Sequence, residues 1–207
     1  MGESLKLHLG CGSNHLKGYC NVDMIETQAT DVVDNIVLLE QFSPDSISHI
    51  VNEHVLEHLS FEDAVNALAR WFDLLTPGAF LTLETPDMIE TCAEFYMVGG
   101  NLNLMPDELL SRYPRLGQLK TSGDWGIYTD WGRMRNIFGA QDTLGQFHKS
   151  GWWDTRLFDV CEAIGYVDIL IQRSVDFEFN ELSVYHFSYH VLEEPCLRMT
   201  AFKPETS

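Results

Sequence analysis

The chain has 207 residues, and its 31 acidic side chains against 13 lysines and arginines give a formal charge of −18. This acidic excess, with no basic stripe, excludes DNA and RNA as expected partners and argues against anionic membrane surfaces. Hydrophobic residues make up 45% of the chain, which is enough for the core of a single domain. No apolar run approaches the roughly 18 residues of a membrane-spanning helix, so no such helix is expected.

The cysteines and the first residues indicate the compartment. The five cysteines show no paired spacing, and Cys11 lies within a glycine turn. This pattern favours reduced thiols over disulfides or a zinc site, as expected in the cytoplasm. The start of the chain leads directly into an apolar strand, without the basic and apolar regions of a signal peptide. We therefore expect a cytoplasmic protein.

The predicted elements alternate between strands and helices. Strands are expected at 5–9, 20–23, 30–33 and 47–52. Next comes a helix at 55–75, which Ser60 restarts internally, a break at 76–78 and a strand at 79–84. A helix at 155–164 and strands at 167–172, 183–191 and 197–203 complete the order. The alternation predicts one α/β domain over residues 1–207, with a mainly parallel sheet and right-handed crossovers.

The alternation stops between about residues 99 and 148. A segment of this length in a compact domain is usually a lid or a binding insert. Its aromatic residues either line a pocket for a flat or sugar-like molecule or form a small satellite core. These residues are Tyr96, Tyr113, Trp125, Tyr128, Trp131, Phe138 and Phe147.

The most informative motif is a glycine turn after the first strand. The strand at 5–9 runs into Gly10-Cys11-Gly12, and Asn21-Val22-Asp23 follows. Such a turn lets the backbone approach a ligand, and the acid can accept hydrogen bonds from both ribose hydroxyls of a nucleoside. A dinucleotide site needs a third glycine and an acid about 20 residues on, and both are missing here. Unless the turn is purely structural, S-adenosylmethionine, which has no phosphate, fits best.

Four segments in order resemble the class I (Rossmann-like) S-adenosylmethionine-dependent methyltransferases, particularly those acting on small molecules. They read LHLGCG at 7–12, NVD at 21–23, HVLEHL at 54–59 and LLTPGAFL at 74–81. The resemblance covers about residues 5–90 and resumes around 151–171. It implies a Rossmann-like three-layer αβα sandwich, with a mostly parallel sheet and an antiparallel C-terminal strand. It also implies that S-adenosyl-L-methionine is the cofactor.

The candidate cofactor-binding residues follow the carboxyl ends of the strands, where ligands bind in such sheets. The resemblance assigns the ribose to Asp23, whose alternative role is to cap a helix. It places Asp34 and Asn35 near the adenine amino group, and residues 52–54 near the methionine part. The full set is Gly10, Cys11, Gly12, Asp23, Met24, Asp34, Asn35, Asn52, Glu53 and His54.

The candidate catalytic residues are Asp87 and His148. Asp87 follows the fifth strand, next to the expected point of methyl transfer. His148 suits a general base, because an ordinary histidine pKa near 6.5 allows proton removal at neutral pH. Its alternative is a hydrogen-bonded loop histidine, and Tyr128 and Asp130 are weaker candidates.

No metal site is expected from the histidines at 54 and 58. They have the spacing of the two ligands in H-E-x-x-H, but Glu57 stands beside His58 and not beside His54. A metal pair at this spacing remains open, whereas the resemblance implies a packing role for both rings.

The expected reaction is transfer of a methyl group from S-adenosylmethionine to an oxygen or nitrogen of a small molecule. Family analogy suggests a saccharide or another secondary metabolite. One alternative is an inactive methyltransferase-fold subunit that serves as a binding partner, and another is a nucleotide-sugar or NAD enzyme. Because the first strand begins almost at Met1, the insert or a second subunit is expected to cover one side of the pocket, so a homodimer is included among the expectations.

Overall fold

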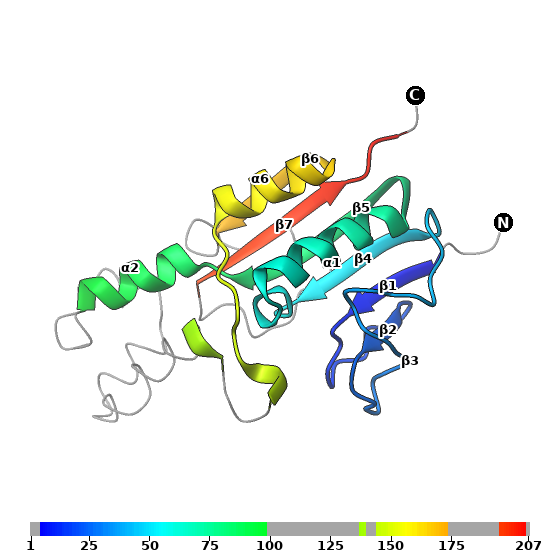
Figure 1. Ribbon diagram of the computed structural model, residues 1–207, viewed down its shortest axis with the longest axis horizontal. Helices are drawn as coiled ribbons and strands as arrows, with labels where there is room; N and C mark the ends of the chain where they lie inside the picture. The colour runs from blue at the N-terminus through cyan, green and yellow to red at the C-terminus, as the bar shows by residue number, and fades with distance from the viewer. Residues whose placement is uncertain (1–4, 99–136, 140–143, 174–194, 206–207) are drawn as a thin grey trace.

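The computed structural model describes residues 5–98, 137–139, 144–173 and 195–205, and a seven-stranded sheet forms its centre (Figure 1). The strand order is β3-β2-β1-β4-β5-β7-β6. The strands are β1 Leu5–Leu9, β2 Cys20–Asp23, β3 Val32–Val33, β4 Ile47–Glu53, β5 Leu75–Pro86, β6 Val167–Arg173 and β7 Cys196–Phe202. The helical elements are η1 Leu56–His58, α1 Phe61–Leu74, α2 Met88–Val98, η3 Leu144–Gln146 and α6 Asp154–Ile164.

The sheet is mostly parallel and confirms the expected fold class. Strands β1 to β5 pair in parallel, whereas β7 lies antiparallel between β5 and β6. The two described helices that pack on the sheet, α1 and α6, cover the same face (Figure 1). The core lies between them and the sheet and includes Trp71, Leu81 and Leu157.

Helix α1 is shorter than the predicted helix at 55–75. Ser60 is its N-cap, since its side chain accepts a hydrogen bond from the Asp63 amide at 3.1 Å. The preceding residues form the separate turn η1. At the other end Leu75 is already extended, and β5 therefore includes the residues predicted to be a break. Gly78 has a φ of +77°, a conformation that favours glycine, which explains why residues 76–78 have the sequence pattern of a break.

The half of the sheet formed by β1, β2 and β3 is connected by turns. No helix occurs between residues 10 and 46, all of which the structure describes. The loop before β4 packs on α1 instead, because Arg70 donates to the carbonyl oxygens of Leu38, Leu39 and Phe42 at 2.7–3.0 Å. Trp71 Nε1 donates to the Ile36 carbonyl at 2.8 Å. These bonds hold the residues just after β3 at the end of the sheet.

Several predicted features lie outside the described residues. They are the strand at 183–191, most of the insert at 99–148, and the side chains of Tyr96, Tyr113, Trp125, Tyr128, Asp130 and Trp131. The extent of the single domain stays a prediction. The described part of the insert includes Phe138 and Phe147, both of which are exposed. Helix α2, at the end of β5, was not predicted. No described helix is long and apolar enough to cross a membrane.

The face of the sheet opposite α1 carries a buried histidine. His49 Nδ1 lies 2.7 Å from the Tyr19 hydroxyl, and Nε2 lies 2.9 Å from the Thr82 hydroxyl. Its ring stacks on Phe80, with centroids 4.1 Å apart. A hydroxyl can donate or accept, so the two contacts satisfy a neutral imidazole. Burial lowers the pKa of His49 to about 4.

This histidine should make stability depend on pH. The imidazole binds a proton near pH 6.5 in the unfolded chain but only near pH 4 in the folded chain. The stability that neutral His49 contributes is therefore complete above pH 6.5 and is lost as the pH falls toward 4. The shift corresponds to roughly 3 kcal/mol. We expect the free energy of unfolding of His49→Gln, measured with urea, to fall less than that of the unaltered protein between pH 7.5 and 4. Parallel pH profiles of the two proteins would contradict this assignment.

Candidate functional site

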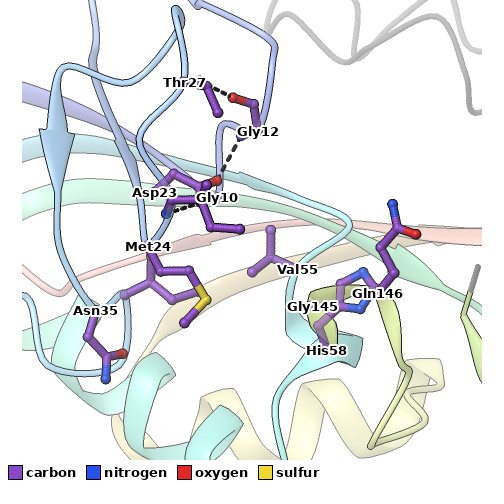
Figure 2. Close-up of a pocket in the computed structure, with 12 residues that line it drawn as sticks. Gly10, Gly12, Asp23, Met24, Thr27, Asn35, Val55, His58, Gly145 and Gln146 are labelled. Atoms are coloured by element: carbon purple, nitrogen blue, oxygen red, sulfur yellow. Dashed lines mark hydrogen bonds between the residues drawn. The ribbon is translucent and has the colours of Figure 1, made fainter. Parts of the chain in front are cut away.

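A cavity of about 320 Å³ opens at the carboxyl ends of β1, β2 and β4 (Figure 2). Its volume is in the range of small-molecule sites. In the view of Figure 2, Met24 and Asn35 lie on one side and His58 and Gln146 on the other. The lining residues are Gly10, Gly12, Asp23, Met24, Ile25, Thr27, Asn35, Ile36, Val55, His58, Gly145 and Gln146.

The glycine turn forms one wall of this cavity. Gly10 has a φ of +71°, and a Cβ at this position would lie 2.2 Å from Val55 Cγ2. Gly10 is therefore required both by its backbone conformation and by the close approach of Val55. The amides of Gly10 and Cys11 donate to the Val22 carbonyl at 2.8 and 3.2 Å, which joins the turn to the end of β2.

Asp23 fixes the turn through its side chain. One carboxylate oxygen accepts from the Gly12 amide at 2.8 Å, and the other accepts from the Ile25 amide at 2.9 Å. The Thr27 hydroxyl donates to the Gly12 carbonyl at 2.6 Å. Figure 2 shows the bonds from Asp23 and Thr27 to Gly12. Each carboxylate oxygen can accept a second hydrogen bond, so Asp23 can hold the loop and still receive ligand hydroxyls.

The charge of the cavity distinguishes between nucleoside ligands. Asp23 is the only carboxylate among the described residues that line it, and these residues include no lysine or arginine. Among these described residues a phosphate would find no lysine or arginine and would face the Asp23 carboxylate. The lining suits a nucleoside without phosphate, and a positively charged group most of all.

The structure brings half of the predicted cofactor residues into the cavity. Gly10, Gly12, Asp23, Met24 and Asn35 line it. Cys11 and Asp34 do not. The Cys11 thiol is buried and faces the Thr30 hydroxyl at 3.8 Å, and burial raises its pKa.

The three predicted residues at the carboxyl end of β4 also lie outside the cavity lining. Asn52 is buried, and its amide nitrogen donates to the Leu9 carbonyl at 3.1 Å, so it ties β4 to β1. Glu53 lies at the end of β4. His54 follows with a φ of +52°, and this left-handed residue turns the chain into η1. The cavity instead receives Val55 and His58.

His54 is held between two buried carboxylates. Its Nε2 lies 2.9 Å from Glu84 and its Nδ1 lies 3.4 Å from Glu57. Burial disfavours its charged form, yet hydrogen bonds, led by those to Cys196 and Glu57, raise its pKa well above the ordinary value. Burial likewise opposes ionisation of Glu57, but the hydrogen bond and charge of His54 lower the pKa of this carboxyl. The two groups therefore form an ion pair.

Asp87 holds a helix. One of its oxygens accepts from the amides of Ile89 and Glu90 at 3.1 and 3.2 Å, so it caps the start of α2. The other accepts from Arg173 Nε at 2.8 Å. Asp87 is 1% exposed and does not line the cavity. These contacts support a positioning role, and the catalytic role expected from sequence stays a prediction.

His148 lies beside a histidine that sequence reasoning assigned to packing. The ring centroids of His58 and His148 are 4.8 Å apart, and His58 lines the cavity. The packing role that the resemblance implies for His58 stays a prediction, and the cavity adds a possible contact with a ligand. The sequence predicted one continuous helix from residue 55, which gave no reason to place His58 of the HVLEHL segment at a cavity. In the structure η1 and α1 are separate elements, and His58 ends η1.

Comparison with known proteins supports the fold. No protein-family model and no curated protein matches the sequence. Three solved structures of S-adenosylmethionine-dependent enzymes illustrate the similarity. An Archaeoglobus fulgidus S-adenosylmethionine-dependent methyltransferase has 14% identity and a TM-score of 0.54, and the match covers 96% of this chain and 85% of that one. A Methanosarcina mazei methyltransferase has 14% identity, coverages of 100% and 95%, and a TM-score of 0.53.

The third structure contains ligands. It is the Burkholderia thailandensis 1,6-didemethyltoxoflavin-N1-methyltransferase, with bound 1,6-didemethyltoxoflavin and S-adenosylhomocysteine. It has 12% identity and a TM-score of 0.53, and the match covers 97% of this chain and 71% of that one. The chain therefore has the Rossmann-like fold of class I S-adenosylmethionine-dependent methyltransferases.

The crowding at Gly10 gives a stability prediction. We expect Gly10→Ala to lower the free energy of unfolding by roughly 2–4 kcal/mol, because strain at positive φ adds to overlap with Val55. Gly18→Ala is the matched control, since Gly18 has a φ of +87° and open space around its Cβ position. It should cost only about 1 kcal/mol. Denaturant unfolding measures both, and adding Val55→Ala to Gly10→Ala should reduce its excess cost. Equal costs for the two alanine variants would contradict the contact.

Proposed function

We propose that this protein is an S-adenosylmethionine-dependent methyltransferase that methylates an oxygen or nitrogen atom of a small molecule. The observation that carries the proposal is the cavity beside the Gly10–Gly12 turn, which contains Asp23 and no described cationic side chain. Its position at the carboxyl ends of the parallel strands is where ligands bind in this class of sheet. The sulfonium of S-adenosylmethionine is a cation, and the ligand has no phosphate that would oppose Asp23.

Different residues of the cavity would bind different parts of the cofactor. Asp23 receives the ribose hydroxyls on the remaining lone pairs of its carboxylate, and Asn35 faces the adenine with an amide that can both donate and accept. Ile25, Ile36 and Val55 provide apolar walls that exclude water. When bound, the sulfonium supplies an electrophilic methyl group for direct displacement. The protein contributes mainly alignment of the acceptor with that group.

The acceptor side of the cavity is proposed to contain the two histidines. His58 lines the cavity opposite Met24 and Asn35, and His148 lies against it. An imidazole there can take the proton of a hydroxyl or an amine as it is methylated. This proposal retains His148 as a base candidate and adds His58, which reaches the cavity.

The small-molecule class rests on two arguments. The charge of −18 opposes a nucleic acid substrate. The Burkholderia thailandensis enzyme, which is similar in fold, contains bound 1,6-didemethyltoxoflavin. A saccharide or secondary-metabolite acceptor, a cytoplasmic location and a homodimer stay predictions.

Cofactor binding provides the test. Calorimetry with S-adenosylhomocysteine should give 1:1 binding, and Asp23→Asn should weaken it about 10- to 100-fold, since a hydrogen bond to a charged group contributes roughly 1.5–3 kcal/mol. Glu26→Gln is the matched control: it removes one negative charge from the same loop, and Glu26 is exposed and does not line the cavity. It should change the affinity less than twofold.

Two results would overturn the proposal. The first is absence of S-adenosylhomocysteine binding at millimolar concentration in folded protein, which would favour the alternative of an inactive methyltransferase-fold partner subunit. The second is equal affinity of Asp23→Asn and Glu26→Gln, which would place the ligand elsewhere. Binding of NAD in place of S-adenosylhomocysteine would support the dinucleotide alternative.

A further inference from the structure

Three side chains with metal-ligating atoms gather beside the cavity. Glu57 and His58 belong to η1, and His148 follows η3. One potential ligand atom from each lies within 4.8 Å of those from the other two. The geometry points to a divalent transition-metal site formed by these three residues, of the class that binds Zn²⁺. Nothing in the sequence pattern predicted it, because His148 is 90 residues from His58 along the chain.

The donor set suits such an ion. Two imidazole nitrogens and one carboxylate oxygen form the ligand set of open catalytic zinc sites and of open iron(II) sites. Metal–ligand distances of about 2.0–2.2 Å place ligand atoms roughly 3–4 Å apart. Small side-chain rotations close the present separation of up to 4.8 Å. Three protein ligands leave at least one coordination position open.

Backbone hydrogen bonds join the two segments that supply the ligands. The amides of Lys149 and Ser150 donate to the Glu57 carbonyl at 2.8 and 3.2 Å. The Ser150 hydroxyl donates to the Leu56 carbonyl at 3.3 Å. The positions of His148 and of Glu57 are therefore fixed relative to each other before any ion binds, which lowers the entropic cost of assembling the site.

The ligands also have the outer contacts typical of metal sites. His58 Nδ1 donates to the Phe147 carbonyl at 3.3 Å, which leaves Nε2 of the neutral ring to bind an ion. Metal-bound histidines almost always donate their other ring N–H to a carbonyl or carboxylate in this way. The Thr85 hydroxyl donates to Glu57 Oε2 at 3.0 Å and orients the carboxylate. The buried carboxylate is thus held in place by the sheet.

A second cluster of potential ligands is a weaker candidate. His54, Glu84 and Cys196 also lie within 4.8 Å of one another. However, Arg198 Nε donates to Glu84 at 2.7 Å, and both residues are buried. A guanidinium keeps its charge and so repels a second cation, whereas the imidazole of His54 beside Glu57 can release its proton as an ion binds. The ion is therefore assigned to the cluster of Glu57, His58 and His148, where one ligand reaches the cavity.

The position of this site suggests its role. Because His58 lines the cavity, an ion with an open position there would coordinate the acceptor hydroxyl or amine and lower its pKa. This role rests on the proposed methyltransferase function, whereas metal binding itself does not. The acceptor class is then one whose methylated oxygen or nitrogen can itself coordinate the ion.

Metal titration of the full chain tests the inference. Calorimetry with Zn²⁺, and visible absorption with Co²⁺, should show one site in the metal-free protein. His58→Ala and His148→Ala should each weaken Zn²⁺ binding by about tenfold or more. His15→Ala is the control, because His15 is a half-exposed histidine that pairs with Asp31 at 3.5 Å and could bind zinc adventitiously. It should leave the affinity within twofold. Since Glu57→Gln alters a buried ion pair, the histidine variants carry the test.

S-adenosylhomocysteine binding by the same samples separates this inference from the proposed function. Zn²⁺ binding that is lost in the His58 and His148 variants supports the metal site whether or not S-adenosylhomocysteine binds. Absence of Zn²⁺ binding, or Zn²⁺ affinity that is unchanged in both variants, overturns it. If S-adenosylhomocysteine still binds in that case, the methyltransferase proposal stands with the two histidines as bases. If Zn²⁺ binds at the site but S-adenosylhomocysteine does not, only the proposed function fails.

Discussion

The burial of Glu57 is the constraint on which the side of the cavity that contains His58 depends. Its carboxylate is 2% exposed, and an unpaired buried charge costs several kcal/mol. Two contacts offset this cost: His54, just before η1, pairs with the carboxylate, and the Thr85 hydroxyl of β5 donates a hydrogen bond to it. The Glu57 carbonyl binds the amides of Lys149 and Ser150, so the same residue also attaches the segment that carries His148. Loss of any of these partners would therefore disturb both the carboxyl ends of the central strands and the positions of His58 and His148.

The opposite side of the cavity depends on a different arrangement. With no helix between residues 10 and 46, the turns after β1 and β2 must supply their own cross-links. Asp23 and Thr27 both bond to Gly12, and α1 holds the loop after β3 through Arg70 and Trp71. The short connections keep this wall thin, which leaves Met24 and Ile25 exposed at 69% and 59%.

The fold was predictable from sequence because its signals are local. Apolar strands ending in polar or glycine residues indicated the sheet, and the order of motifs indicated its topology. Within the site, Gly10, Gly12 and Asp23 were predictable since each lies at or just after the carboxyl end of a strand. The contacts of Asn52, His54 and Asp87 were less predictable. A polar residue at a strand end can contact a ligand or make a structural hydrogen bond, and only the tertiary contacts show which bonds it makes. The pairing of His58 with His148 requires the fold itself.

The two sides of the cavity meet in one short segment. Val55 contacts the Gly10 position, and His58, three residues later, reaches the other wall. His54 begins this segment in a left-handed conformation that its pairing with Glu84 and Glu57 stabilises. A shift of η1 would therefore move Val55 and His58 together, and with them both walls of the cavity. Under the proposed function, this coupling would hold the nucleoside side and the acceptor side of the cavity at a fixed separation, which is the alignment that a direct displacement requires.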